Sequence, residues 1–156
     1  MDLHPSSRTV NDILAAAGLP GRVHILPEPA PTASAAARQL GCPVGAIANS
    51  LVFSTSDEEP VLIMTSGRHR VDLDRVREDY GLDLHRASAD FVRAHTGQPI
   101  GGVAPVGHPR PLRTLVDRAL ADYEQLWAAG GIPHAVFPVS YPDLVLLTNG
   151  TEADVA

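Results

Sequence analysis

The segment from Thr96 to Pro111 combines glycines and prolines with apolar residues in a pattern that suits chemistry by the main chain. Its centre reads Ile100-Gly101-Gly102-Val103-Ala104-Pro105-Val106-Gly107. A flexible linker would not need the interleaved isoleucine and valines, so we expect an ordered loop. Adjacent glycines let a ligand approach the backbone closely, and their N–H groups suit an oxygen that becomes negative during a reaction. A tight structural turn explains the same residues equally well, and composition leaves both interpretations open.

Other catalytic patterns are weak or missing from the sequence. Gly97 and Gly102 have the separation of a phosphate-binding loop, but Val103 stands where its lysine must be, and no dinucleotide-binding glycine pattern occurs. The seven histidines show no metal-binding spacing, so we expect no metal site. Cys42 follows a predicted helix end, where the helix dipole disfavours a thiolate, so a packing role is favoured over a nucleophile. No serine-nucleophile motif is present.

The elements that must position the loop are marked by capping residues, glycines and apolar runs. Helices are predicted to begin at Ser7, Thr32, Asp72, Ser88 and Ser140 and to end near Gly18, Gly41, Tyr80, His95 and Gly150. Strands are predicted at 22–26, 47–54, 60–65, near Leu84 and at 134–139. The run 50–53 is apolar without alternation, as in a central strand covered on both faces.

Residues 112–127 admit two interpretations. Their apolar positions follow helical spacing, which favours one helix. Alternatively, 112–116 and 125–129 are strands that flank one short helix. Asp117 is a helix cap or a site carboxylate, and the cap is favoured when the residue is taken alone.

Composition restricts the class of protein. The 156 residues suffice for one domain with a substantial core, and we expect a single domain over 1–156. Neither an export signal nor a membrane-spanning apolar run is present, so we expect a soluble, cytoplasmic protein without a membrane partner. One cysteine excludes an internal disulfide framework. A net charge of −6 without any lysine argues against a broad DNA-binding face, but it allows a small pocket for the end of a nucleic acid.

Several segments, taken in order, resemble the YbaK/EbsC family of aminoacyl-tRNA editing deacylases, which is related to the insertion domain of prolyl-tRNA synthetase. The segments cover nearly the whole chain, and Gly-x-x-x-Pro from Gly101 to Pro105 is the most specific. They are Thr32 with its alanine-rich helix to Gly41, 47–53, Val71-Asp72-Leu73, Thr96-Gly97, 100–107, Leu115-Val116-Asp117, 127–131 and Asp143-Leu144.

The resemblance implies an α/β fold of the α+β type, with a curved mixed sheet surrounded by helices and a pocket between the sheet and the glycine loop. It also favours the strand interpretation of 112–116 and 125–129. Family members hydrolyse the ester of a mischarged tRNA, often tRNA(Pro) carrying alanine or cysteine, and no cofactor or metal is implied. The implied partner is the aminoacylated acceptor end of a tRNA, with an aminoacyl-tRNA synthetase as a further partner left open.

Site residues carry over from the resemblance position by position. Gly101 and Gly102 would line the aminoacyl carbonyl with backbone N–H groups. Asp117 would lie near the pocket, hydrogen-bonded to the loop or the substrate. The catalytic group implied is Gly101, Gly102, Asn49 and Asp117, and the substrate-binding group is Thr32, Ser50, Pro105, Ala129, Gly130 and Gly131.

Two departures from the family pattern matter. Asn49 stands where many members carry a lysine that holds the tRNA end, and an amide brings no charge. Ala129 stands where several members carry serine. Arg68-His69-Arg70 could supply positive charge near the pocket, although a solvated loop is the favoured interpretation. The leading hypothesis is a deacylase, and the rivals are a non-catalytic module for an aminoacyl-nucleotide or amino-acid-like ligand and an esterase or amidase for small molecules.

Overall fold

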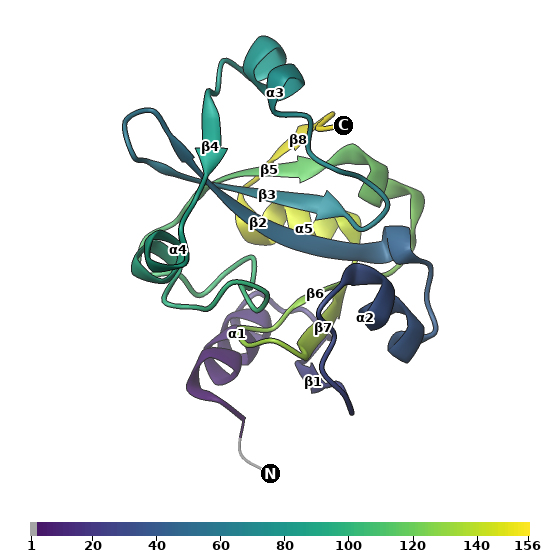
Figure 1. Cartoon of the computed structure of the whole chain (residues 1–156). Coiled ribbons are helices and arrows are strands. Elements are labelled where there is room, and N and C mark those ends of the chain that lie inside the picture. The colour runs from purple at the N-terminus through teal and green to yellow at the C-terminus, as the bar shows by residue number, and fades with distance from the viewer. Residues whose placement is uncertain (1–2) are drawn as a thin grey trace.

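The computed structural model describes residues 3–156 and shows one mixed sheet with helices on both faces (Figure 1). Its strand order is β1-β7-β6-β2-β3-β5-β8, and β4 pairs with β2 off this path. The pairs β2–β6, β3–β5 and β5–β8 are parallel, and the remaining pairs are antiparallel. The strands are β1 (His24–Ile25), β2 (Ile47–Thr55), β3 (Pro60–Ser66), β4 (Leu84–Arg86), β5 (Arg113–Asp117), β6 (Leu126–Ala129), β7 (Ala135–Val139) and β8 (Thr151–Ala153).

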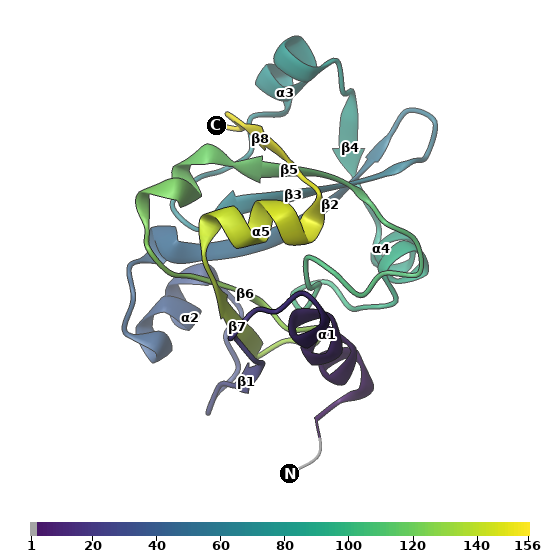
Figure 2. The same cartoon turned by 180° about the vertical axis from the view of Figure 1, so that it is seen from behind.

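The helices divide between the two faces of the sheet. α1 and α5 pack on one face, where Val10 and Leu144 join a core with Leu62 and Met64 of β3 (Figure 2). α3 packs on the opposite face, where Val76 contacts a second core that contains Ile63. The helices are α1 (Pro5–Ala16), α2 (Ala33–Leu40), α3 (Leu73–Tyr80), α4 (Ala89–Thr96) and α5 (Tyr141–Thr148), with 3-10 helices η1 (Val44–Ala46) and η2 (Arg118–Asp122).

Most predicted helix starts are confirmed, because capping depends on neighbours in the chain. The side chains of Thr32, Asp72, Ser88 and Ser140 each accept a hydrogen bond from the N–H group three residues on. The prediction that the first helix begins at Ser7 is wrong. α1 begins at Pro5 with His4 as its cap, since proline suits the first helical position.

Residues 112–127 form β5, the short 3-10 helix η2 and the start of β6, so the alternative of two strands around one short helix is confirmed and the single helix is wrong. β5 is inserted between β3 and β8, and β6 pairs with β2, so the helical spacing of the apolar residues is overridden by partners far away in the chain. The predicted strand 22–26 shortens to β1. The strand predicted at 134–139 begins one residue later, because His134 has a φ of 65° and leaves the extended conformation.

Candidate functional site

A cavity of about 650 Å³ lies where the sheet divides. β2 pairs with β6 at Ile47 and Ala48, and with β4 from Phe53 onward. Between these points the same edge of β2 has no partner strand in the described part of the chain. The cavity is lined there by β2, β6, β7, the start of α2 and the glycine loop, defined as 100–107. This loop folds back between α4 and the β6–β7 hairpin, beneath β2 in Figure 1.

Five of the predicted site residues line this cavity: Thr32, Asn49, Ser50, Gly101 and Ala129. Thr32 Oγ1 accepts from Ala35 N at 3.1 Å, which leaves its hydroxyl hydrogen for a ligand. The Ser50 hydroxyl donates to Met64 Sδ at 3.3 Å, and a thioether is a weak acceptor. Within residues 3–156 neither hydroxyl is hydrogen-bonded to a carboxylate or an imidazole. Neither is therefore an activated nucleophile.

The lining contains no arginine, aspartate or glutamate, and its one ionisable imidazole belongs to His134. His134 was not among the predicted site residues, because a histidine without a motif resembles an ordinary surface residue. Its nearest signal in the sequence is the preceding glycine pair Gly130-Gly131, which predicts an irregular turn. The wall is otherwise built from alanines, prolines and larger apolar side chains, including Trp127. The site therefore suits a neutral ligand group better than a charged one.

The two central glycines of the loop, Gly101 and Gly102, differ in their surroundings. Gly101 has a φ of 88° and open space around the position of a Cβ atom. Gly102 faces the β6–β7 turn so closely that a Cβ atom would lie 2.4 Å from the Ile132 carbonyl carbon. The Gly102 N–H group also donates to Pro99 O at 3.0 Å, so the expected donation to a substrate carbonyl is not available to it here. Within the described chain, the N–H groups of Gly101 and Val103 have no acceptor and remain the candidate donors.

Three further predicted residues are not part of the cavity lining. Pro105 is buried. The Gly130 carbonyl accepts from the buried Ser7 hydroxyl at 2.7 Å. Gly131 has a φ of 104°, and a Cβ atom there would lie 2.9 Å from Ser6 Cβ. The glycine pair therefore fastens α1 to the β6–β7 turn, and this contact explains why Ser7 is not a cap.

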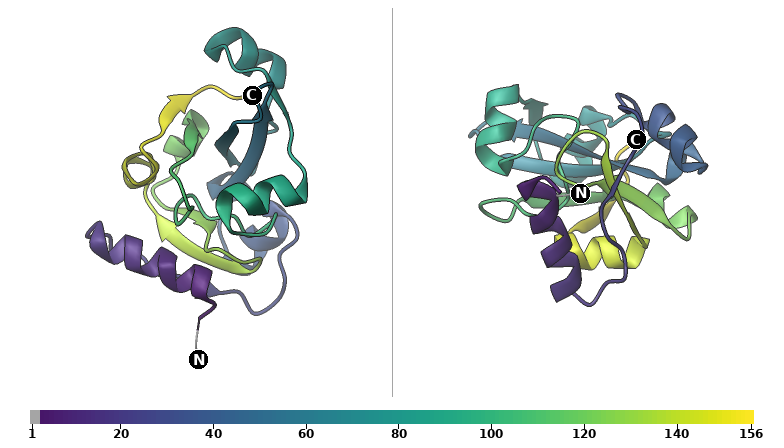
Figure 3. Two further views of the ribbon diagram at one scale, coloured as in Figure 1. Left: turned by 90° about the vertical axis from the view of Figure 1, so that its left-hand side faces the viewer. Right: turned by 90° about the horizontal axis from the view of Figure 1, so that it is seen from below.

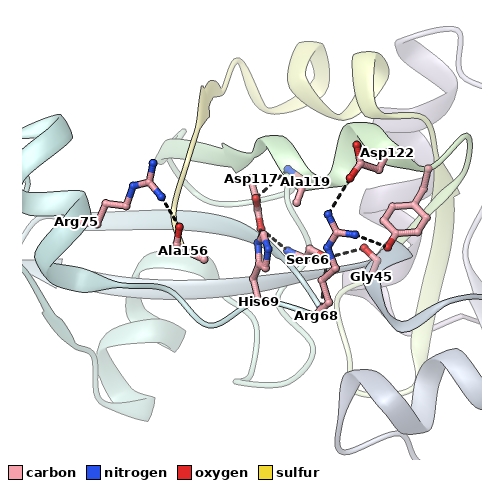
Figure 4. Close-up of polar contacts among 10 residues, drawn as sticks. Gly45, Ser66, Arg68, His69, Arg75, Asp117, Ala119, Asp122 and Ala156 are labelled. Carbon is pink, nitrogen blue, oxygen red and sulfur yellow. Dashed lines mark hydrogen bonds and ion pairs between the residues drawn. The ribbon is translucent and has the colours of Figure 1, made fainter.

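Asp117 lies at the end of β5, outside the cavity lining (Figure 4). Its carboxylate is 2% exposed and accepts from Ser66 N and Ala119 N, each at 3.0 Å. The His69 ring nitrogen Nδ1 lies 2.9 Å from the same carboxylate. Asp117 caps η2, so the capping interpretation is confirmed. The expected hydrogen bond to the glycine loop is not what the structure shows.

Arg68 and Arg70 of the basic loop 68–70 are exposed, as the interpretation as a solvated loop predicted. Arg68 pairs with Asp122 Oδ2 at 2.8 Å and donates to Tyr123 Oη at 3.2 Å (Figure 4). These contacts and the pairing of His69 with Asp117 direct both side chains to η2 and the end of β5, and none of the three residues lines the cavity.

No cluster of three or more histidine, cysteine, aspartate or glutamate side chains within residues 3–156 is placed to hold a metal ion. Over the same residues, no helix combines the length and hydropathy needed to cross a bilayer.

Comparison with known proteins places these features in a family context. The model of the aminoacyl-tRNA editing domain family matches residues 27–147. The Bacillus subtilis (strain 168) protein YwhH is 26% identical over 113 residues, which cover 72% of each chain. A crystal structure of a candidate trans-editing enzyme for prolyl-tRNA synthetase is 39% identical, with a TM-score of 0.91 over 99% of this chain and 98% of that one. The hypothetical protein APE2540 is 30% identical, with a TM-score of 0.86 over 94% and 98%.

Proposed function

Because the chain belongs to the aminoacyl-tRNA editing domain family, we propose that it hydrolyses the ester bond of a mischarged tRNA. We further propose that the substrate is tRNA(Pro) carrying a small wrong amino acid. The structurally similar candidate trans-editing enzyme for prolyl-tRNA synthetase supports this choice. In this proposal residues 1–156 act as one cytoplasmic editing domain that binds the acceptor end of the tRNA and needs no cofactor.

The observation that carries the proposal is that free main-chain N–H groups of the glycine loop lie at a cavity whose lining contains no arginine, aspartate or glutamate. Gly101 and Val103 both line the cavity. Their N–H groups would stabilise the negative charge that develops on the ester carbonyl oxygen. Since the hydroxyls of Thr32 and Ser50 are hydrogen-bonded to no carboxylate or imidazole within residues 3–156, the attacking group in this proposal is a water molecule or a hydroxyl of the substrate itself. The protein contributes positioning and charge stabilisation.

The remaining lining residues would hold the two ends of the substrate. Asn49 would hydrogen-bond the terminal nucleotide, in place of an ionic contact. Ala129 and Thr32 lie on other parts of the wall and would contact the aminoacyl group or the ribose. Pro105, Gly130 and Gly131 would act through the shape of the loop and turn that they stabilise.

The direct test is deacylation of alanyl-, cysteinyl- and seryl-tRNA(Pro) by the purified protein, with correctly charged prolyl-tRNA(Pro) as the matched control. Turnover of one mischarged species, with the control spared, would support the proposal and identify the amino acid. A folded protein that cleaves none of them would contradict the proposed substrate.

A non-catalytic binding module is the second candidate, and the uncharged residue Asn49 at the cavity favours it. An Asn49→Lys variant distinguishes the two. In a weakened enzyme, the added ammonium group should lower KM for a mischarged tRNA because it can contact a phosphate. In a dedicated binder it should produce no turnover, while binding of an aminoacyl-nucleotide analogue changes.

A further inference from the structure

Two side chains outside the cavity hold the glycine loop through a single residue, Ala104. The Ala104 N–H group donates to Gln98 Oε1 at 2.7 Å. The Ala104 carbonyl lies 2.7 Å from His108 Nε2. Ala104 is fully buried, so its N–H and carbonyl groups depend on these two side chains for their hydrogen bonds. A buried peptide group without its partners is costly, and these two side chains therefore fix the conformation of the loop at this point.

Gln98 links the two arms of the loop. Its side chain is 2% exposed, and besides accepting from Ala104 it donates from Nε2 to Val106 O at 3.4 Å. A Cβ atom at Gly107 would lie 3.4 Å from the same nitrogen, so the amide packs directly against the returning chain. Gln98 precedes Gly101 and Gly102 in the chain, and Val106 follows them. The Gln98 side chain therefore joins the two ends of the loop.

Gln98 and His108 together form a clamp on Ala104, and His108 acts in it as a neutral hydrogen-bond donor. Since its partner is a carbonyl, the hydrogen is on Nε2. Burial lowers the pKa of His108, which favours the uncharged ring. The hollow beside it is lined by Ser6, Thr9, Gln98 and other uncharged residues, so no carboxylate there stabilises a protonated ring.

We propose that Gln98 and His108 are positioning residues, which hold the Gly101 and Val103 N–H groups in the geometry that deacylation requires. The inference rests on the proposed function. Val103 directly precedes the clamped Ala104, and Gly101 lies two residues before Val103, so a rotation of the Ala104 peptide groups would displace both donors. Because neither side chain lines the cavity, their loss should affect the reaction rate rather than substrate binding.

The test compares variants of the clamp with matched variants on the surface. His108→Ala and Gln98→Ala should each lower kcat by about tenfold or more and change KM by less than about threefold. His108→Gln should recover part of kcat, because its amide N–H can replace the imidazole donor. His85→Ala and Gln125→Ala alter exposed residues and should match the wild type. Each assay is run well below the melting temperature of the variant.

Two results would overturn the inference. One is a folded His108→Ala protein with wild-type kcat, and the other is a lower melting temperature without any change in kcat. If the wild type cleaves none of the mischarged tRNAs, the proposed function fails separately. Hydrogen exchange at the Ala104 amide, which donates to Gln98 Oε1, then tests the clamp. Exchange should be faster in Gln98→Ala than in the wild type or Gln125→Ala, and equal rates would refute the clamp.

Discussion

Replacing Gly102 with alanine tests the close approach between the glycine loop and the β6–β7 turn. The added methyl group would lie 2.4 Å from the Ile132 carbonyl carbon, 2.6 Å from its Cα atom and 2.6 Å from Pro133 N. All three are backbone atoms, so no side chain can rotate away. The two segments must separate by about 1 Å to reach ordinary contact. Since Pro133 and His134 line the cavity, this separation moves one of its walls.

The size of the effect follows from this geometry. Overpacking of this kind costs about 1–3 kcal/mol, which for a chain of this length corresponds to a melting temperature lower by about 2–12 °C. A displacement of about 1 Å at a reacting group can lower the rate by about a hundredfold. Gly101→Ala meets nothing within 4 Å, and its positive φ costs about 1–2 kcal/mol. We therefore expect Gly102→Ala to lose much more activity than Gly101→Ala.

Thermal unfolding and single-turnover deacylation measure the two effects separately. Gly18→Ala is the matched control, because Gly18 also has a positive φ with open space around it but lies at the end of α1, outside the cavity. It should lower stability about as much as Gly101→Ala and leave the rate unchanged. If Gly102→Ala melted and reacted like the wild type, the close approach and the role assigned to the β6–β7 turn would both be wrong.

Three further predictions concern buried polar groups. Thr65→Val should raise the free energy of unfolding by about 1 kcal/mol, because Thr65 Oγ1 is buried without a hydrogen-bond partner in the described chain. A urea titration measures this change, and a destabilised variant would show that the hydroxyl does have a partner. Asp117→Asn should lower the free energy of unfolding by about 2–3 kcal/mol in the same titration. The buried carboxylate accepts from two N–H groups and contacts His69, whereas the amide that replaces it has one acceptor oxygen. An unchanged midpoint of the titration would contradict this expectation. His108 has a pKa below its ordinary value of about 6.5, so the unfolded chain takes up the proton first as pH falls. The contribution of His108 to the free energy of unfolding should be complete above about pH 6.5 and should decline as the pH falls. The difference in this free energy between wild type and His108→Gln should therefore be smaller near pH 5.5 than near pH 7.5. An equal difference at both pH values would refute the lowered pKa of His108.

The sequence predicted local structure well and long-range pairing poorly. The caps at Thr32, Asp72 and Ser88 could be predicted because a side chain and an N–H group three residues away are enough to make them. Ser7 has the same residue type, but its hydroxyl donates to the carbonyl of Gly130, a partner 123 positions away in the sequence. The helical spacing in 112–127 misleads for the same reason, because pairing with distant strands overrides the local preference.

The cavity was predicted in part. Asn49, Thr32 and Gly101 line the cavity, and the substrate contacts that the family resemblance implies for them stay predictions. Asp117 was expected near it, but the carboxylate is used to join β3, β5 and η2, which no pattern in a single sequence reveals. Gln98 and His108 were not predicted either, since a lone glutamine or histidine carries no signal until the peptide group that it binds is known.

The division of the sheet also affects when the cavity can form during folding. Its lining runs from Leu26 to Val136, and the short strand β1 pairs with β7, which is distant in the sequence (Figure 3). Contacts of such high sequence separation form slowly, because a long loop must close before they add stability. A nascent chain that has emerged only as far as β5 contains the glycine loop but lacks the wall made by β6 and β7. Ligand binding should therefore appear with the last phase of refolding, after most of the secondary structure has formed.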